Sequence, residues 1–268
     1  MTAQHVPLRR QLSVGSNHVH FLGVEFTKFD AAHILDDLRR LAYAKRFSYV
    51  VTPNVDHLVG INCNEDIELG LRVRDACLAA ALCLCDSRVL ARLARISGQR
   101  LDVLPGSDLT RDLLLHGVRP GDRLALIGGT PRQLEWLQAN WPDIDCFQFI
   151  PQMGVLRNPQ AQREIAEFVE KVPCDYYLFA FGAPQSELVA LQIRQRGVAR
   201  GVALCIGASI DFLSGDKRRA PRWFQKRSLE WAFRLVTEPR RLWRRYLVRG
   251  PKIICYWWLH GRARYQRI

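Results

Sequence analysis

The 268-residue sequence lacks any apolar run long enough to cross a membrane. The apolar stretch IICYWWL at 253–259 falls far short of the roughly 20 residues that a membrane-spanning helix needs. Residues 1–18 also lack the apolar core of a secretory signal peptide, and we interpret them as a flexible N-terminal tail. These absences favour a protein that stays in the cytoplasm.

Several motifs with well-known chemistry are also missing. The eight cysteines form no C-x-x-C pair and mostly lie in apolar runs, which indicates reduced structural thiols rather than a zinc site or disulfides. There is no G-x-G-x-x-G, no Walker lysine and no G-x-S-x-G. No D-x-D motif follows a predicted strand, so we expect neither a bound metal nor a cofactor.

Positive charge is distributed unevenly along the chain, whose net charge is +13. Residues 217–268 hold 16 Lys and Arg against two acids, whereas residues 1–216 hold 23 basic and 24 acidic residues. The body is therefore almost neutral and the C-terminal segment is strongly cationic. Such a split indicates an anionic surface or a polyphosphate ligand at one end of the molecule.

Apolar, β-branched or aromatic runs alternate with segments of helical period. The runs lie at 20–26, 47–51, 82–85, 123–129, 176–182 and 202–207. The helical segments that follow them lie at 30–44, 55–62, 88–96, 130–141, 183–197 and 208–215. This alternation predicts an α/β fold, a Rossmann-like, mostly parallel sheet flanked by helices. Ligands of such sheets bind at the carboxyl ends of the strands.

The residues at those strand ends are the first candidates for a site. They are Thr52, Asn54, Asp86, Gly128, Gly129, Gly182 and Gly207. Asp86 follows the apolar run LCLC, and a carboxylate there can either cap the next helix or act as a general base at the rim. The role of His57 is open in the same way: it is either a packed or surface histidine or a residue of the site.

The stretch GGTPRQ predicts both a helix start and a close backbone approach. Thr130 can cap the helix, Pro131 suits its first turn and Gln133 completes a capping box. The two preceding glycines let backbone amides approach a phosphate at the positive helix end. A turn needed only for chain geometry is an equally good interpretation.

The cationic segment has the pattern of an interfacial helix. Pro239 opens the stretch PRRLWRRYL, in which apolar side chains share one face beside arginines. Five of the seven tryptophans lie in this segment, and Trp and Tyr prefer the headgroup layer of a bilayer. The predicted membrane-binding residues are Arg240, Arg241, Trp243, Arg244, Arg245 and Tyr246. An ordinary amphipathic helix that docks on the body is the alternative.

Seven stretches resemble, in order and spacing, the WecG/TagA/CpsF family of bacterial glycosyltransferases. They are VVTPNVDHLV, CDS, LPGSDLT, IGGT, FGAPQSE, CIGASIDFLSG and RRAPRWFQKRSLEWAFRLVTEPRRLWRRYL. The resemblance implies a Rossmann-like enzyme of the type called GT-E. Members move a hexosyl unit from a UDP-sugar to a polyprenyl-diphosphate-linked sugar with inversion. They act peripherally at the cytoplasmic face of the cell membrane in cell-surface polysaccharide biosynthesis.

The resemblance also implies roles for single residues. Asp86 matches the family's proposed catalytic base, and Thr52 is a second catalytic candidate. The implied substrate-binding residues are Asn54, Gly128, Gly129, Thr130, Gly182, Pro184, Gln185, Glu187, Arg218, Arg219 and Arg222. The chain departs from the family pattern at Ser87, where glycine is common, and at Ser186, where glutamine is usual.

The implied organisation has three parts. Residues 1–18 form the tail, 19–216 the Rossmann-like catalytic domain, and 217–268 a basic, Trp/Arg-rich appendage that attaches to the membrane and completes the site. Expected partners are a UDP-sugar donor, with an N-acetylmannosamine or glucose type of sugar, a lipid-linked saccharide acceptor, an anionic membrane surface and, in a homo-oligomer, a second copy of the chain. The alternatives are a nucleic-acid-binding protein that uses the basic aromatic tail and a nucleotide-binding regulator without chemistry; we expect no nucleic acid.

Overall fold

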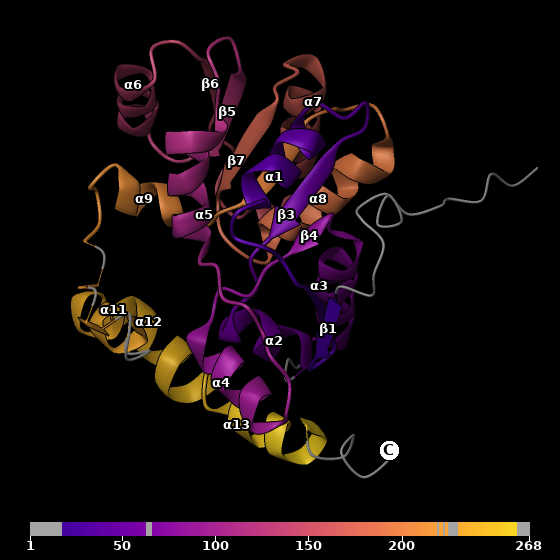
Figure 1. Ribbon diagram of the computed structural model, residues 1–268, viewed down its shortest axis with the longest axis vertical. Helices are drawn as coiled ribbons and strands as arrows, with labels where there is room; N and C mark the ends of the chain where they lie inside the picture. Colours follow the sequence, from indigo (N-terminus) through magenta and orange to yellow (C-terminus); the bar gives the residue numbers. More distant parts are fainter. Residues whose placement is uncertain (1–17, 63–65, 219, 222, 225–229, 262–268) are drawn as a thin grey trace, which may run out of the picture.

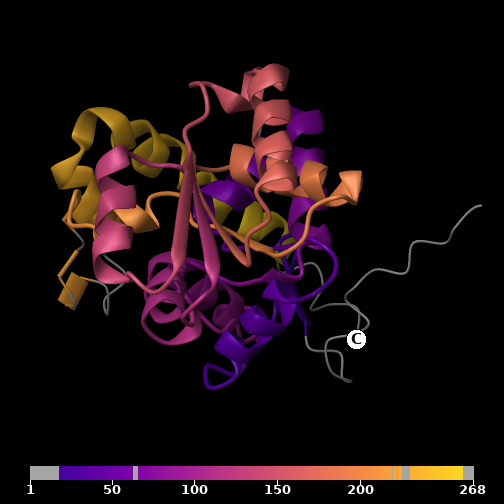
Figure 2. The same cartoon turned by 90° about the horizontal axis from the view of Figure 1, so that it is seen from above.

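A computed structural model describes residues 18–62, 66–218, 220–221, 223–224 and 230–261 of the chain. One sheet of six parallel strands forms its centre, with helices on both faces (Figures 1 and 2). The predicted α/β class with a parallel sheet is confirmed. Within the described residues no helix is long and apolar enough to cross a bilayer.

The strand order of the sheet is β4-β3-β8-β7-β5-β6. The strands are β3 (Ser48–Val51), β4 (Leu82–Cys83), β5 (Arg123–Gly128), β6 (Asp145–Phe149), β7 (Tyr176–Ala180) and β8 (Val202–Cys205). The predicted run at 82–85 is thus a very short edge strand, extended only by an isolated bridge from Cys85 to Val103. Because all strands are parallel, their carboxyl ends form a single rim.

Alternation along the strands divides the core into two layers. Val51 and Ile127 face the layer beneath α2 (Val55–Asn62), α3 (Ile67–Ala79), α7 (Pro159–Lys171) and α8 (Gln185–Arg196). Val50 and Leu126 face the layer beneath α1 (Ile34–Ala42), α5 (Gly106–Asp112), η2 (Leu113–Gly117) and α6 (Pro131–Asn140). Successive side chains of a strand point to opposite faces, so a strand buried on both sides reads as a continuous apolar run.

One strand prediction needs correction, and one strand of the sheet was not predicted. The run at 20–26 is not one strand but a hairpin, β1 (His18–Phe21) and β2 (Val24–Thr27), outside the parallel sheet. Leu22 and Gly23 form its turn with φ of 48° and 82°, the left-handed pair that matches strand twist in two-residue hairpins. The strand β6 was missed because its residues are only partly buried at the sheet edge and do not form an apolar run.

The C-terminal segment lies across the carboxyl end of the sheet (Figure 1). It contains α11 (Glu230–Thr237), α12 (Pro239–Trp243), the π-helical η4 (Arg244–Arg249), α13 (Lys252–Tyr256) and η5 (Trp257–Gly261). Ile253 of α13 is buried in the core, and the Trp257 indole donates a hydrogen bond of 2.8 Å to the Ser97 hydroxyl. These contacts dock the segment against α2 and against α4 (Arg88–Ile96).

Candidate active site

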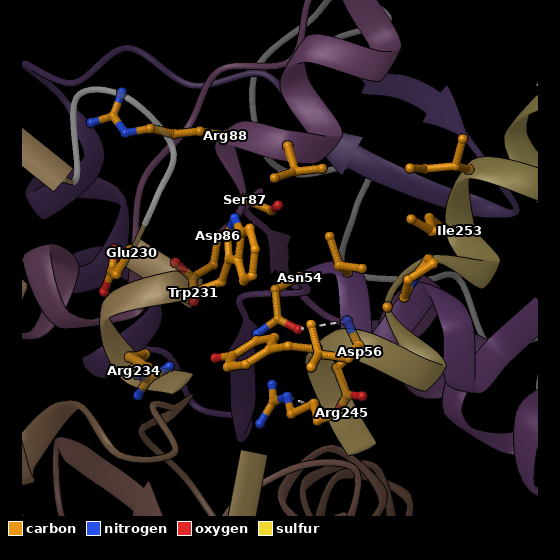
Figure 3. Close-up of a pocket in the computed structure, with 17 residues that line it drawn as sticks. Asn54, Asp56, Asp86, Ser87, Arg88, Glu230, Trp231, Arg234, Arg245 and Ile253 are labelled. Carbon is orange, nitrogen blue, oxygen red and sulfur yellow. Dashed lines mark hydrogen bonds and ion pairs between the residues drawn. The ribbon is translucent and has the colours of Figure 1, made fainter. Parts of the chain in front are cut away.

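A cavity of about 450 Å³ lies between the rim of the sheet and the C-terminal segment. The loops after β3 and β4 contribute Asn54 and Asp86 to its wall. The opposite wall comes from Trp231, Arg234, Arg245 and Tyr246. The cavity is therefore formed only when residues more than 140 positions apart in the sequence come together (Figure 3).

Asp86 does not cap the helix that follows it. The cap of α4 is Ser87, whose hydroxyl accepts a hydrogen bond of 3.2 Å from the Leu90 amide. The Asp86 backbone amide donates to the Pro53 carbonyl at 3.0 Å, which anchors the loop to the end of β3. Among the described residues none donates a hydrogen bond to the Asp86 carboxylate, which is left to face the cavity.

Burial raises the pKa of Asp86 to about 7, and the nearby Glu230 carboxylate adds to the rise. The electrostatic interactions with Arg234 and His57 act in the opposite direction and lower the pKa. A carboxyl whose pKa is close to neutral accepts a proton far more readily than an ordinary aspartate, which is mostly too weak a base. The environment of Asp86 thus suits a general base near neutral pH.

Asn54 is oriented so that its amide nitrogen faces the cavity. Its side-chain oxygen accepts from the Asp56 amide at 3.0 Å and contacts His57 Nδ1 at 3.1 Å. No described residue accepts a hydrogen bond from the Asn54 side-chain NH₂ group, which points toward the cavity (Figure 3). A donor from Asn54 and an acceptor from Asp86 therefore stand on the same wall, a combination that suits sugar hydroxyls.

A buried histidine–glutamate pair lies behind this wall. His57 Nε2 and Glu187 Oε1 are 3.2 Å apart, and their side chains are only 7% and 3% exposed. The second Glu187 oxygen, Oε2, is buried, and no residue in the described part of the chain donates a hydrogen bond to it. From the sequence alone the role of His57 is open, and Glu187 is predicted to bind substrate. The only sequence signal for the pair was the spacing of His57 from Asn54, because Glu187 lies on a different helix.

Thr52 lies next to these residues but behind the cavity wall. Its hydroxyl is buried and is 3.4 Å from the Cys205 carbonyl, which it faces as a weak hydrogen-bond donor. A Cβ on Gly106 would come within 3.0 Å of the Thr52 oxygen. Thr52 is therefore confined between neighbouring strand ends, and its predicted catalytic role stays a prediction.

The glycine turn lies on the same rim but well away from Asp86. Strands β3, β8 and β7 separate β4 from β5, so Gly128, Gly129 and Thr130 do not line the cavity. Gly129 has φ of 69°, and a Cβ there would come within 2.5 Å of Gln133 Oε1. That oxygen accepts from the Thr130 amide at 3.0 Å as part of the predicted capping box. The turn thus needs glycine for structural reasons, and phosphate binding there stays a prediction.

The loop before α8 is held mainly by internal contacts. Gly182 has φ of 82°, and Ser186 donates a hydrogen bond of 2.8 Å to its carbonyl. Gln185 accepts from the Leu156 amide at 3.1 Å, and Pro184 precedes the helix. Of the residues predicted in this loop, only Glu187 reaches the neighbourhood of Asp86, through His57.

The arginines near the cavity differ from those predicted to bind substrate. Arg218 is exposed and does not line the cavity, while Arg219 and Arg222 lie outside the described residues. Arg234, which sequence reasoning did not single out, lines the cavity, and its buried Nε has no hydrogen-bond partner among the residues that the structure describes. Arg245 lines it as well, with Nε 3.3 Å from Asp56 Oδ2.

The predicted membrane residues separate into two groups. Arg245 and Tyr246 belong to the cavity wall. Arg240, Arg241, Trp243 and Arg244 are exposed on the outer side of α12 and η4. The Arg244 guanidinium lies over the Trp243 ring, 5.3 Å from its centroid. The C-terminal segment thus combines residues that dock on the body of the protein with an exposed basic surface.

The chain thus has a Rossmann-like α/β fold with a cavity at the carboxyl rim of the sheet, and the C-terminal segment forms one wall of that cavity. The chain belongs to the WecG/TagA/CpsF family of glycosyl transferases, whose family model matches residues 19–267. It is also similar to the N-acetylglucosaminyldiphosphoundecaprenol N-acetyl-beta-D-mannosaminyltransferase of Bacillus spizizenii strain W23. The two are 37% identical over 190 residues, which cover 69% of this chain and 71% of the relative. The resemblance stated from the sequence is confirmed, and the protein is a glycosyltransferase.

Proposed function

We propose that the protein transfers a hexosyl unit from a UDP-sugar to a polyprenyl-diphosphate-linked sugar, with inversion, in the biosynthesis of a cell-surface polysaccharide. The acceptor class follows the name of the Bacillus relative, whose substrate carries a diphosphoundecaprenol group. The observation that supports the proposal most strongly is the position of the Asp86 carboxylate. It does not cap α4, and it lines a cavity beside Asn54 and two arginines. A sugar of the N-acetylmannosamine or glucose type is the donor that we expect.

Asp86 is the general base of this mechanism. The acceptor hydroxyl has a very high pKa and attacks an anomeric carbon poorly unless its proton is removed as the new bond forms. In a single displacement the acceptor oxygen bonds to the anomeric carbon, Asp86 takes the hydroxyl proton, and the bond to the UDP oxygen breaks. One base is sufficient for this step, and attack from the face opposite the leaving group inverts the anomeric centre.

Arg234 and Arg245 stabilise the leaving group. Breaking the glycosidic bond to UDP leaves a negative charge on the diphosphate oxygen, and positioned cations in a cavity that excludes water stabilise such a charge strongly. No described residue accepts a hydrogen bond from the buried Nε of Arg234, which leaves part of its hydrogen-bonding capacity for a ligand. Charge-assisted hydrogen bonds from guanidinium to phosphate are short, directional and often bidentate.

The acceptor reaches the cavity from the bilayer surface. The C-terminal segment exposes Trp243, Leu247, Trp258 and Leu259, and the net positive charge of the chain comes from this segment, since residues 1–216 are almost neutral. Exposed tryptophans and leucines beside arginines are typical of segments that lie in the headgroup layer of anionic membranes. The segment that we expect to bind the membrane is also one wall of the cavity, so the sugar of a lipid-anchored acceptor would lie next to Asp86.

The experiment is a transfer assay with purified protein, a panel of UDP-sugars and a short-chain polyprenyl-diphosphate-linked N-acetylglucosamine. We expect one UDP-hexose to give a disaccharide product, whose anomeric configuration by NMR is opposite to that of the donor. Retained configuration would contradict a single displacement by Asp86. Absence of transfer from every donor would contradict the proposed acceptor or donor class.

A further inference from the structure

A second concave site lies on the outer face of α4, beside the catalytic cavity. Its volume is about 560 Å³, and four arginines line it together with Ala91, Leu101 and Val103. The arginines are Arg88, Arg92, Arg95 and Arg100, and we call this site the arginine groove. Arg88 lines both the groove and the catalytic cavity, so the two sites are neighbours.

The positive charge of the groove is almost uncompensated. Arg88, Arg92 and Arg95 recur at helical spacing on one exposed face of α4, and none of them forms an ion pair with a described residue. Arg100 faces Asp102, with Nε 3.4 Å from Oδ1, and is itself 92% exposed. Four guanidinium groups with one carboxylate among them attract anions.

The arrangement is also unfavourable for the helix itself. Arg88 is the first residue of α4, and the first turn contains no acidic residue. A cation at the positive end of a helix dipole destabilises the helix, and an anion bound there would remove that cost. The charge distribution of α4 is thus better explained by an anionic ligand than by the stability of the helix.

Exposed apolar side chains near the arginine groove indicate which class of anion it binds. Ile96, Ile254, Trp258 and Leu259 are all more than half exposed. The hydrogen bond from Trp257 to Ser97 holds η5 against the end of α4, next to Ile96. Arginines beside exposed aliphatic and Trp side chains match the headgroup layer of a bilayer, where apolar groups insert and cations contact phosphate.

We propose that the arginine groove binds the phosphate groups of anionic lipid headgroups, so that α4 of the catalytic body contacts the bilayer together with the C-terminal segment. The proposal rests on the proposed function insofar as the acceptor is anchored in a membrane. Such binding would orient the enzyme on the membrane. Contacts on both sides of the cavity would hold the Asp86 wall at a fixed angle to the bilayer surface that supplies the acceptor.

The test is co-sedimentation of the full chain with vesicles of phosphatidylglycerol and phosphatidylcholine, compared with phosphatidylcholine alone. The groove variant is Arg92→Gln/Arg95→Gln/Arg100→Gln, which leaves Arg88 of the catalytic cavity unchanged. The matched control is Arg46→Gln/Arg119→Gln/Arg200→Gln, three exposed arginines at the amino ends of β3, β5 and β8, on the opposite edge of the sheet. Both variants lose the same net charge.

We expect the groove variant to bind the anionic vesicles at least about tenfold more weakly, since each arginine at such a surface is worth roughly a fivefold change in affinity. The control variant should bind like the wild type. Equal losses in both variants, or no loss in the groove variant, would overturn the proposal. Circular dichroism and thermal melting of both variants establish that the comparison is between folded proteins.

Competition distinguishes the lipid from other anions. A soluble short-chain diphosphate-linked acceptor or a single-stranded oligonucleotide should not displace the wild-type protein from anionic vesicles. Displacement by either would assign the groove to the acceptor diphosphate or to nucleic acid and overturn the lipid proposal. A failure of the proposed function would show itself separately, as the absence of sugar transfer to the soluble acceptor in a solution without vesicles.

Discussion

His57 and Glu187 are 130 residues apart in the sequence, yet His57 Nε2 lies 3.2 Å from Glu187 Oε1 beneath the wall of the cavity. The opposite side of the His57 ring contacts the Asn54 side chain, whose NH₂ group faces the cavity. The pair connects the start of α8 to the first turn of α2 and supports Asn54, one of the two polar groups on the Asp86 wall. The electrostatic interaction with His57 also acts to lower the pKa of Asp86.

The first prediction concerns this electrostatic link. His57→Gln removes the imidazole whose protonated form opposes the rise in the Asp86 pKa, so the acid limb of the kcat/KM profile should move to higher pH. A shift of one pH unit would lower the rate at pH 6 by about tenfold and leave the rate at pH 9 nearly unchanged. His33→Gln, at an exposed histidine, is the control. A His57→Gln profile that superimposes on the wild type would disprove the link.

The second prediction concerns stability. The pKa of Asp86 is about 7 in the folded protein, against 3.8 for an unperturbed aspartate, so the folded state binds the proton more tightly than the unfolded state. The stabilising effect of that proton is complete below pH 3.8 and is lost as the pH rises toward 7. Asp86→Asn should therefore raise the free energy of unfolding at pH 8 by about 1–2 kcal/mol, allowing for partial solvent screening.

Urea denaturation at pH 8 and at pH 4 measures this difference, with Asp75→Asn as the control at an exposed carboxylate. The stabilisation by Asp86→Asn should shrink strongly at pH 4, where the wild-type carboxyl is protonated. An Asp86→Asn variant that is less stable than the wild type at pH 8 would show that the carboxylate has a structural role.

The third prediction concerns the two arginines of the cavity. Arg234→Gln and Arg245→Gln should each weaken UDP binding by about tenfold, because each loses a charge-assisted contact to the diphosphate. Arg163→Gln, at an exposed residue of α7, should bind UDP like the wild type. Isothermal titration calorimetry measures the three affinities. Unchanged UDP affinity in both cavity variants would place the diphosphate elsewhere, with the glycine turn before α6 as the next candidate.

The fourth prediction separates insertion from charge at the membrane. Trp243→Ala/Trp258→Ala removes two exposed tryptophans, which are 44% and 59% exposed, and should weaken binding to neutral and anionic vesicles alike. Variants of the arginine groove should weaken binding to anionic vesicles only. Co-sedimentation at low and high salt distinguishes the two behaviours, since only the charge-dependent part is screened. Binding that is insensitive to the tryptophans would contradict the interfacial placement of the C-terminal segment.

The sequence predicted the parts of the fold that depend on local pattern. The alternation of apolar runs and helical segments indicated the parallel sheet, and the capping box at Thr130 marked the start of α6 correctly. The hairpin at residues 18–27 was missed because a Leu-Gly turn inside an apolar run does not interrupt the hydrophobic pattern. Strand β6 was missed because an edge strand with half-buried side chains lacks that pattern.

The sequence indicated single candidate residues of the site but not which residues lie together in it. The position of Asp86 after an apolar run placed it at the rim, but whether it caps the next helix depended on Ser87, which caps that helix instead. The partners of Asp86 come from distant segments: Arg234 and Glu230 from α11, and His57 from α2. No local pattern encodes such neighbours, since their proximity arises from strand order and from the docking of the C-terminal segment.

The Asp86 carboxylate is central to the proposed transfer as its general base. The most direct test is the kcat of Asp86→Asn with the soluble acceptor, measured on protein whose fold and UDP affinity are shown to match the wild type. We expect a loss of roughly 10² to 10⁴ in kcat, the usual contribution of a positioned base. Turnover by Asp86→Asn at the wild-type rate would contradict the assignment of Asp86 as the base.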